Sequence, residues 1–193
     1  MINDIAFKKL KSRGKKKFNL FKSVSDIKRI TDGMLPSDGE IYKFISMTGG
    51  LSSITFITWV AQTKIIDELT VSTLRVGEGQ FRELARLANA GKLKKARYFV
   101  SSMQAEIDGK AKKYNYFKHI QDIAQKCDWK AIVVNNHSKI ILIRTQDDFY
   151  VLETSSNLNE NPKIEQHSFA NDKELYDFYY DFFDRLEDKM KGT

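Results

Sequence analysis

The sequence predicts an α/β domain in which a mixed, mostly parallel sheet is flanked by helices. Short apolar segments alternate along the chain with amphipathic stretches of helical period. Such alternation is typical of a layered fold with parallel strand pairing. A later apolar hairpin is expected to add antiparallel strands. The chain has 193 residues, of which 41% are hydrophobic, so one core of ordinary size is expected.

The expected strands are apolar runs bounded by turn residues: 40–47, 68–74, 96–100 and 129–134, followed by the hairpin strands 139–144 and 149–153. The expected helices carry apolar residues at helical spacing: one starting near Leu51, then 80–90, 114–126 and 172–191. Gly91 can end the second helix, and Asn171 or Asp172 can cap the last. The Gly49-Gly50 turn lacks the lysine and spacing of a P-loop, so it predicts a tight strand-to-helix connection.

Basic residues gather in two segments. Residues 1–35 are predicted to be a basic extension, and residues 36–193 the folded domain. The second basic segment is 103–113, and the net charge of +7 favours a polyanionic partner. The alternative for residues 1–35 is a solvated arm that docks on the domain through its apolar residues. The candidate nucleic-acid-binding residues are Lys15, Lys16, Lys17, Lys110, Lys112 and Lys113.

The cysteine count, the apolar runs and the spacing of possible metal ligands indicate where the protein is located and whether it needs a cofactor. The single cysteine, Cys127, allows no intramolecular disulfide, which fits a reducing compartment. The sequence has no apolar run of about 18 residues that would predict a membrane span. We therefore expect a cytoplasmic protein with no membrane partner. No H-x-x-x-H or C-x-x-C spacing occurs, so neither a metal nor another cofactor is expected.

Polar residues gather at both ends of the predicted hairpin. His137 and Lys139 are two apart before its first strand and share one face. Ser155 and Asn157 follow its second strand, and Glu165 comes later. Each has an ordinary structural explanation as a strand-end, turn or surface residue. Together they supply a nucleophile, a cation, hydrogen-bond donors and a carboxylate, which suits phosphoryl transfer without a metal.

These residues resemble the histidine–lysine motif of the phospholipase D superfamily. The pattern H-x-K, a hairpin, G-S-x-N and a later glutamate falls on His137, Lys139, Ser155, Asn157 and Glu165. Two positions depart from it. Thr154 replaces the glycine before the serine, and Arg144 replaces the aspartate that longer motifs place five residues after the lysine. The second departure resembles the bacterial endonuclease branch, and the layout resembles a phospholipase D-like half-domain.

The resemblance implies a composite site in a homodimer. The family needs two such motifs, and of His119, His137 and His167 only His137 is followed by a lysine two residues later. It implies a phosphohistidine on His137, with Lys139, Asn157 and Ser155 holding phosphate oxygens and Glu165 orienting the imidazole. We expect a nuclease, with DNA as the first candidate substrate. The alternatives are a non-catalytic nucleic-acid-binding module of the same fold, or a lipid phosphodiesterase.

Overall fold

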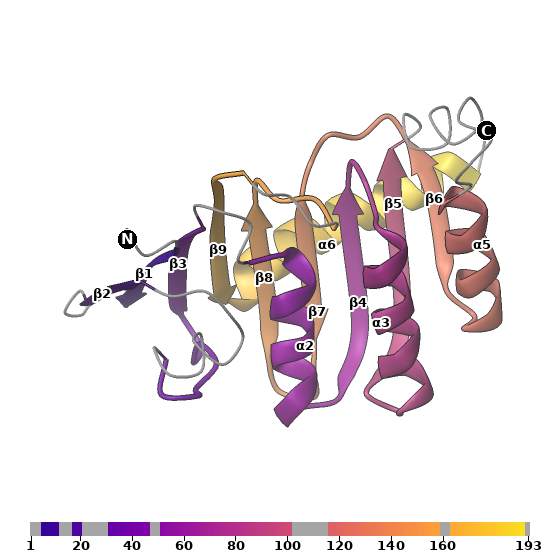
Figure 1. Ribbon diagram of the computed structural model, residues 1–193. Helices are drawn as coiled ribbons and strands as arrows, with labels where there is room; N and C mark the ends of the chain where they lie inside the picture. The colour runs from indigo at the N-terminus through magenta and orange to yellow at the C-terminus, as the bar shows by residue number, and fades with distance from the viewer. Residues whose placement is uncertain are drawn as a thin grey trace.

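The computed structural model describes residues 5–11, 17–20, 31–46, 51–101, 116–158 and 163–191. They form an α/β fold built on one mixed sheet (Figure 1), as the sequence predicts. The strands are β1 Ile5–Lys11, β2 Lys17–Leu20, β3 Glu40–Ser46, β4 Ile66–Thr73, β5 Leu93–Ser101, β6 Lys130–Val134, β7 Ile140–Arg144, β8 Phe149–Thr154 and β9 Glu165–Asn171. The helices are α2 Ser53–Thr63, α3 Glu78–Asn89, α5 Tyr116–Lys126 and α6 Lys173–Lys191.

Pairing in the sheet is mostly antiparallel, which corrects the expected mostly parallel arrangement. The order among the described strands is β2-β1-β3-β9-β8-β7-β4-β5-β6. Only the β4–β5 and β5–β6 pairs in this described sheet are parallel. The strand–helix alternation therefore predicted the parallel pairing correctly for β4, β5 and β6, which α3 and α5 connect. It failed for β3, because β9 and the hairpin lie between β3 and β4.

Strand β9 is the element that the sequence did not reveal. Its sequence, EQHSFAN, carries few apolar residues, so the alternation that marks a half-buried strand is hidden. Its burial nevertheless alternates at the start, because Glu165, His167 and Phe169 are buried while Gln166 is exposed. Polar side chains thus occupy core positions of β9. Glu165 accepts a hydrogen bond from Ser155, and His167 Nδ1 lies within hydrogen-bond distance of Thr154 Oγ1.

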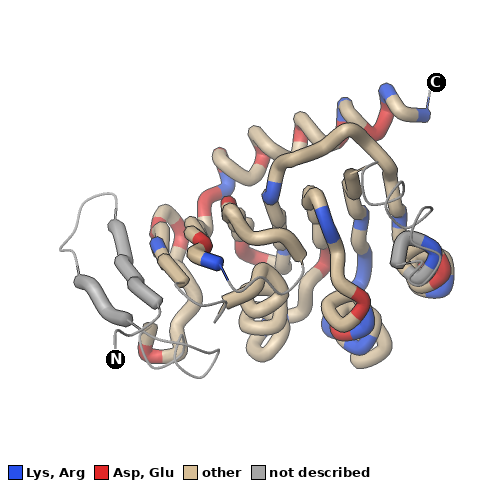
Figure 2. The backbone as a smooth tube through the Cα atoms, turned by 45° about the horizontal axis from the view of Figure 1, so that its top comes forward, with Lys and Arg blue, Asp and Glu red and all other residues tan. Residues whose placement is uncertain are grey.

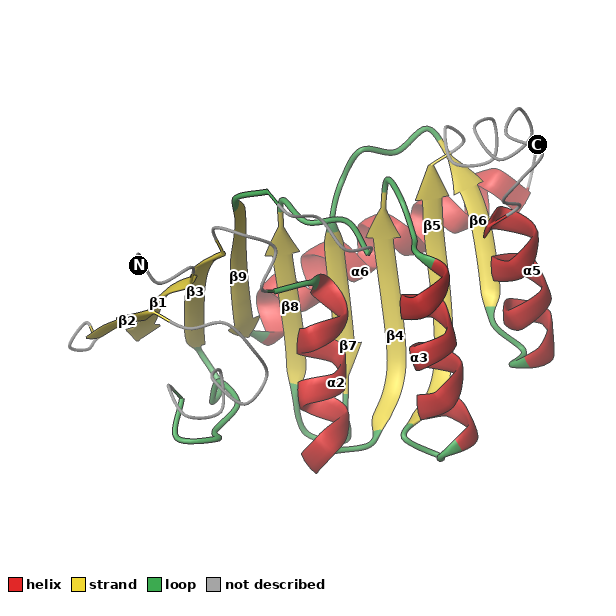
Figure 3. Cartoon of the chain, viewed as in Figure 1, coloured by secondary structure: helices red, strands yellow, loops and turns green. Residues whose placement is uncertain are grey.

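Helices cover both faces of the sheet. The helices α2, α3 and α5 lie on one face, and the long α6 crosses the other (Figures 1 and 3). The larger core lies under the first three helices, where Phe56 and Trp59 of α2 pack on Phe169 of β9. The smaller core lies under α6 and includes Tyr176 and Phe183. Each layer therefore buries its own apolar stripe.

Arg97 of β5 fixes α6 to the sheet. Its side chain is 7% exposed and donates hydrogen bonds to Thr70 Oγ1 at 2.9 Å and to Glu187 at 3.3 Å. The guanidinium also lies 4.5 Å from the ring centre of Tyr180. Burial opposes ionisation of Glu187, but hydrogen bonds from Lys130, Lys191 and Arg97 lower its pKa to about 2. Arg97 thus joins β4 and β5 to the last turns of α6 through Thr70 and Glu187.

No helix among the described residues is long and apolar enough to cross a membrane.

Candidate active site

The sheet register brings four of the predicted residues to one edge. His137 and Lys139 precede β7, Ser155 follows β8, and Glu165 begins β9. The Thr154 amide donates to the Lys139 carbonyl at 3.1 Å, and the Ser155 amide donates to the Gln166 carbonyl at 3.1 Å. Antiparallel pairing therefore joins the start of β7, the end of β8 and the start of β9.

His137 and Lys139 contact each other directly. The Lys139 Nζ atom lies 3.1 Å from His137 Nδ1 and donates to the His137 carbonyl at 2.8 Å. An ammonium group can only donate, so the Nδ1 atom must be the acceptor, and the proton of a neutral ring lies on Nε2. The imidazole itself is exposed to solvent. Partial burial lowers the pKa of Lys139, while the charge of Glu165 acts in the opposite direction.

Ser155 and Glu165 form a second pair. Ser155 Oγ donates a hydrogen bond to a carboxylate oxygen of Glu165 and accepts one from the Gln166 amide at 3.0 Å. Glu165 is 5% exposed. The carboxylate thus acts on the site in two ways, by holding the serine hydroxyl and by placing negative charge near Lys139.

Asn157 lies beside the start of α2. Ser53 Oγ, in the first turn of that helix, donates to the Ser156 carbonyl at 3.1 Å and lies 3.5 Å from the Asn157 carbonyl. The Asn157 Oδ1 atom is buried and has no hydrogen-bond partner in the described part of the chain. The loop after β8 is therefore anchored to α2 by its backbone carbonyls.

Thr154, which stands where the family pattern has glycine, anchors the same loop. Its Oγ1 atom accepts from the Ser156 amide at 2.9 Å and lies 3.0 Å from the Gln166 carbonyl and 2.8 Å from His167 Nδ1. Burial lowers the pKa of His167 to about 4, so its imidazole is neutral near pH 7. The threonine hydroxyl and the buried histidine together fix the backbone that carries Ser155 and Asn157.

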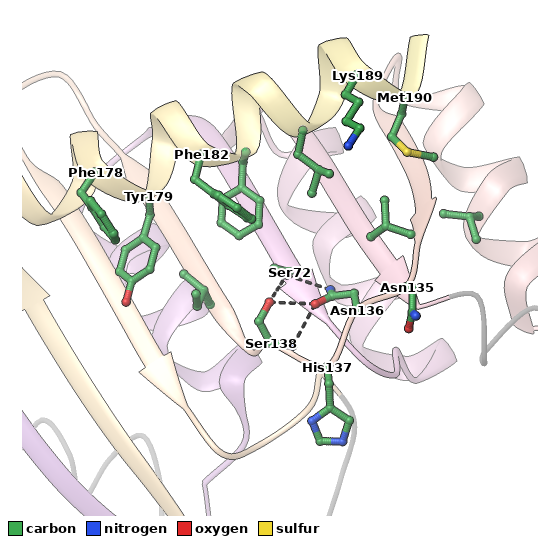
Figure 4. Close-up of a pocket in the computed structure, with 15 residues that line it drawn as sticks. Ser72, Asn135, Asn136, His137, Ser138, Phe178, Tyr179, Phe182, Lys189 and Met190 are labelled. Atoms are coloured by element: carbon green, nitrogen blue, oxygen red, sulfur yellow. Dashed lines mark hydrogen bonds between the residues drawn. The ribbon is translucent and has the colours of Figure 1, made fainter. Parts of the chain in front are cut away.

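Three further residues, which sequence reasoning missed, hold the segment that carries His137 (Figure 4). Asn136 Oδ1 accepts from the Ser138 amide at 2.8 Å, and Asn136 Nδ2 donates to Ser72 Oγ at 2.8 Å and to the Phe99 carbonyl at 3.1 Å. The hydroxyl oxygens of Ser72 and Ser138 are 2.6 Å apart. The sequence did contain one sign of this turn, because an asparagine two residues before a serine is typical of an Asx turn. His137 is at the tip of that turn and points away from the cluster.

Two cavities border the site. The larger has a volume of about 940 Å³ and lies between α6 and the segment 133–140, with His137 and Ser138 in one wall and Phe178 and Phe182 in the other. The smaller, of about 560 Å³, extends past Lys139 and Thr154 toward Lys43 of β3. In the described ranges, no group of three or more His, Cys, Asp or Glu residues is arranged to hold a metal ion.

The basic segments cannot be placed in the same way. Lys15, Lys16, Lys110, Lys112 and Lys113 lie outside the described residues, and Lys17 begins β2 with its side chain not described. Their role in binding nucleic acid stays a prediction.

No protein-family model and no curated protein matches the sequence. Among solved structures, the fold is similar to polyphosphate kinase from Porphyromonas gingivalis, with a TM-score of 0.52 and 16% identity over 69% of this chain and 21% of that one. It is also similar to phosphatidylserine synthase from Haemophilus influenzae Rd KW20, with a TM-score of 0.48 and 13% identity over 69% of this chain and 35% of that one.

A third similar structure is TrmBL2, an archaeal chromatin protein described with a novel mode of DNA binding, with a TM-score of 0.47 and 10% identity over 76% of this chain and 52% of that one. This chain thus spans between about a fifth and about half of the length of these three structures. These similarities concern the fold, which is consistent with a phospholipase D-like α/β domain.

Proposed function

We propose that the protein is a phosphodiesterase of the phospholipase D superfamily that hydrolyses nucleic acid, with DNA as the first substrate, without a metal ion. The observation that carries the proposal is the contact between His137 and Lys139 at the edge where Ser155 and Glu165 also meet. An exposed imidazole beside a lysine ammonium suits attack on a phosphodiester, because the cation stabilises the negative charge that develops on the phosphoryl oxygens. The fold likeness to a polyphosphate kinase supports a phosphate-handling site.

The reaction has two steps. In the first, a ring nitrogen of His137 attacks phosphorus, a P–N bond forms, and the P–O bond to the leaving nucleotide breaks while an acid protonates that oxygen. In the second, water attacks the phosphohistidine, the P–N bond breaks, and the group that gave the proton takes one from water. Lys139 turns from the imidazole to the phosphate oxygens, which frees Nδ1. Asn157 supplies a further hydrogen bond, and Glu165 holds the Ser155 hydroxyl at the edge of the site.

One imidazole cannot serve both as nucleophile and as the acid on the opposite side of phosphorus. The proposed acid is His137 of a second copy of the chain, so the active species is a homodimer whose two half-sites share one phosphate.

The test is cleavage of plasmid DNA in EDTA. The wild-type protein is expected to nick or linearise the DNA, and His137→Ala is expected to lose activity by at least ~1,000-fold, because a covalent step cannot proceed without its nucleophile. Asn135→Ala is the matched control, since Asn135 is an exposed neighbour on the same segment. Cleavage that requires magnesium would refute the histidine mechanism.

The non-catalytic alternative has its own signature in the same assay. A nucleic-acid-binding module would retard DNA in a gel without cutting it in any buffer. The observation that favours this alternative is the presence of Thr154, whose side chain fills space that the glycine of the family pattern leaves open. Turnover of phosphatidylcholine without DNA cleavage would instead indicate a lipid phosphodiesterase.

A further inference from the structure

Helix α6 carries two apolar stripes, and a surface helix needs only one. The first stripe is buried on the sheet and includes Tyr176 and Phe183. The second consists of Phe178, Phe182 and Met190, with the half-buried Leu186 between them, at a spacing of four residues. Phe178 is 67% exposed and Phe182 is 57% exposed. A continuous exposed apolar stripe of this kind marks an interaction surface.

The polar residues that border the second stripe differ between its two halves. With about 3.6 residues per turn, the charged residues beside its outer margin are Lys173, Asp177 and Asp181 in the first half and Arg185 and Lys189 in the second, and Lys173 pairs with Asp177. Figure 2 shows these charges distributed along α6. The margin therefore has a net negative charge in the first half of the helix and a net positive charge in the second half.

This charge order selects the partner. Six acidic and four basic side chains lie on α6, in a chain whose net charge is +7. A nucleic-acid backbone or an anionic membrane would be repelled by the acidic half. A second α6, laid antiparallel about a two-fold axis, places the acidic half of each helix against the basic half of the other. Asp181 of one copy then faces Arg185 of the other, twice by symmetry.

We infer that α6 is the homodimer interface and that the stripe Phe178–Phe182–Leu186–Met190 packs antiparallel on the same stripe of a second copy. The stripe lines the cavity whose other wall carries His137 and Ser138, so the second copy closes that cavity beside the proposed half-site. The interface is argued from α6 alone, and its connection with the reaction rests on the proposed function. The aromatic side chains supply the buried centre that protein interfaces use for most of their affinity.

Sedimentation velocity of the full chain tests the apolar part of the interface. Wild-type protein is expected to sediment at twice the chain mass of 22.4 kDa in the micromolar range. Phe182→Asp is expected to weaken dimerisation by at least ~30-fold, because each dimer would bury two unpaired carboxylates. Ile65→Asp is the matched control, since Ile65 is 48% exposed and lies outside α6. Circular dichroism confirms that each variant is folded.

A charge exchange tests the antiparallel arrangement. Asp181→Arg and Arg185→Asp are each expected to weaken the dimer several-fold, because each places like charges opposite one another. The double variant restores the opposite pairing and is expected to recover the wild-type dimer. A parallel or unrelated interface would show no recovery.

The outcomes separate this inference from the proposed function. A dimer that responds to these variants but cuts no DNA in EDTA would leave the interface standing and refute the function. A wild-type monomer at all concentrations, or a dimer indifferent to Phe182→Asp, would overturn the interface. A monomer that binds anionic vesicles through Phe182 would assign the stripe to a membrane.

Discussion

At the scale of residues, Asn136 holds the turn that carries His137. Its amide group spans the Ser138 amide, the Ser72 hydroxyl and the Phe99 carbonyl, so it joins the turn to β4 and β5 at once. Asn136→Ala is expected to lower kcat by roughly 10- to 100-fold with little change in KM, because a displacement of about 1 Å suffices for such a loss. Initial rates on a fluorescent oligonucleotide in EDTA measure both constants.

The control for Asn136 is its neighbour. Asn135→Ala removes the same side chain from an exposed position and is expected to leave both constants unchanged. Asn136→Asp keeps the acceptor for Ser138 and loses both donated bonds, so an intermediate kcat is expected. Equal losses from Asn135→Ala and Asn136→Ala would show that the asparagine has no positioning role.

The residues of the candidate site were predictable to different degrees. The pairing of His137 with Lys139 follows from their spacing of two in an extended segment, and the hairpin accounts for the approach of Ser155. The bonds of Thr154 and Glu165 depend on β9, which the sequence does not mark as a strand. Asn136 was overlooked because its partners, Ser72 and the Phe99 carbonyl, lie on strands distant in sequence.

At the scale of elements, the join between β8 and β9 depends on a neutral histidine. His167 has a pKa of about 4 in the folded protein and an ordinary value of 6.5, so the unfolded chain takes up the proton first as the pH falls. Its contribution to stability is therefore intact above about pH 6.5 and is lost as the pH falls toward 4. The wild type is expected to lose about 2 kcal/mol from this group between about pH 7.5 and pH 5.

Urea denaturation at the two pH values measures this loss. His167→Gln cannot titrate and keeps a polar atom near Thr154, so its stability is expected to change with pH by about 2 kcal/mol less than that of the wild type. The difference between the two proteins removes the contribution of all other ionisable groups. A parallel pH dependence for both would contradict a depressed pKa at His167.

The predictability of the elements follows the amount of apolar sequence in each. The helices and the strands β4 to β8 have periodic apolar residues, and their bounds lie close to the expected ones. β9 was missed because polar residues fill its buried positions. Residues 1–35 were expected to be a basic extension, and β1 and β2 within that range pair beside β3. Lysine-rich sequence conceals the alternation that would have predicted these strands.

At the scale of the whole molecule, the net charge of +7 predicts salt-sensitive binding of nucleic acid. The inactive variant His137→Ala is expected to bind DNA with an affinity that falls as salt rises. Replacing Lys15, Lys16 and Lys17 by glutamine is expected to reduce the slope of log K against log salt by up to ~0.9 for each phosphate that a lysine no longer neutralises. Fluorescence anisotropy on a labelled duplex measures the slope.

A control for this prediction lies on α3. Arg82 and Arg86 pair with Glu78 and Glu83 on the same helix, so their replacement by glutamine is expected to leave the slope unchanged. An unchanged slope after the three lysine replacements would exclude residues 15–17 from the contact with DNA.

The pairing of β3 with β9 has a consequence for how the chain folds as it is made. Glu40 pairs with Asn171 and Ser46 with Glu165, so β3 cannot complete its pairing until the much later strand β9 has been made. Contacts of such long sequence separation form slowly and raise the contact order of the domain. A chain emerging from the ribosome has no β9 until most of its length is exposed. A nascent chain that stops before Glu165 also lacks the carboxylate that holds Ser155, so the site can assemble only after β9 has been synthesised.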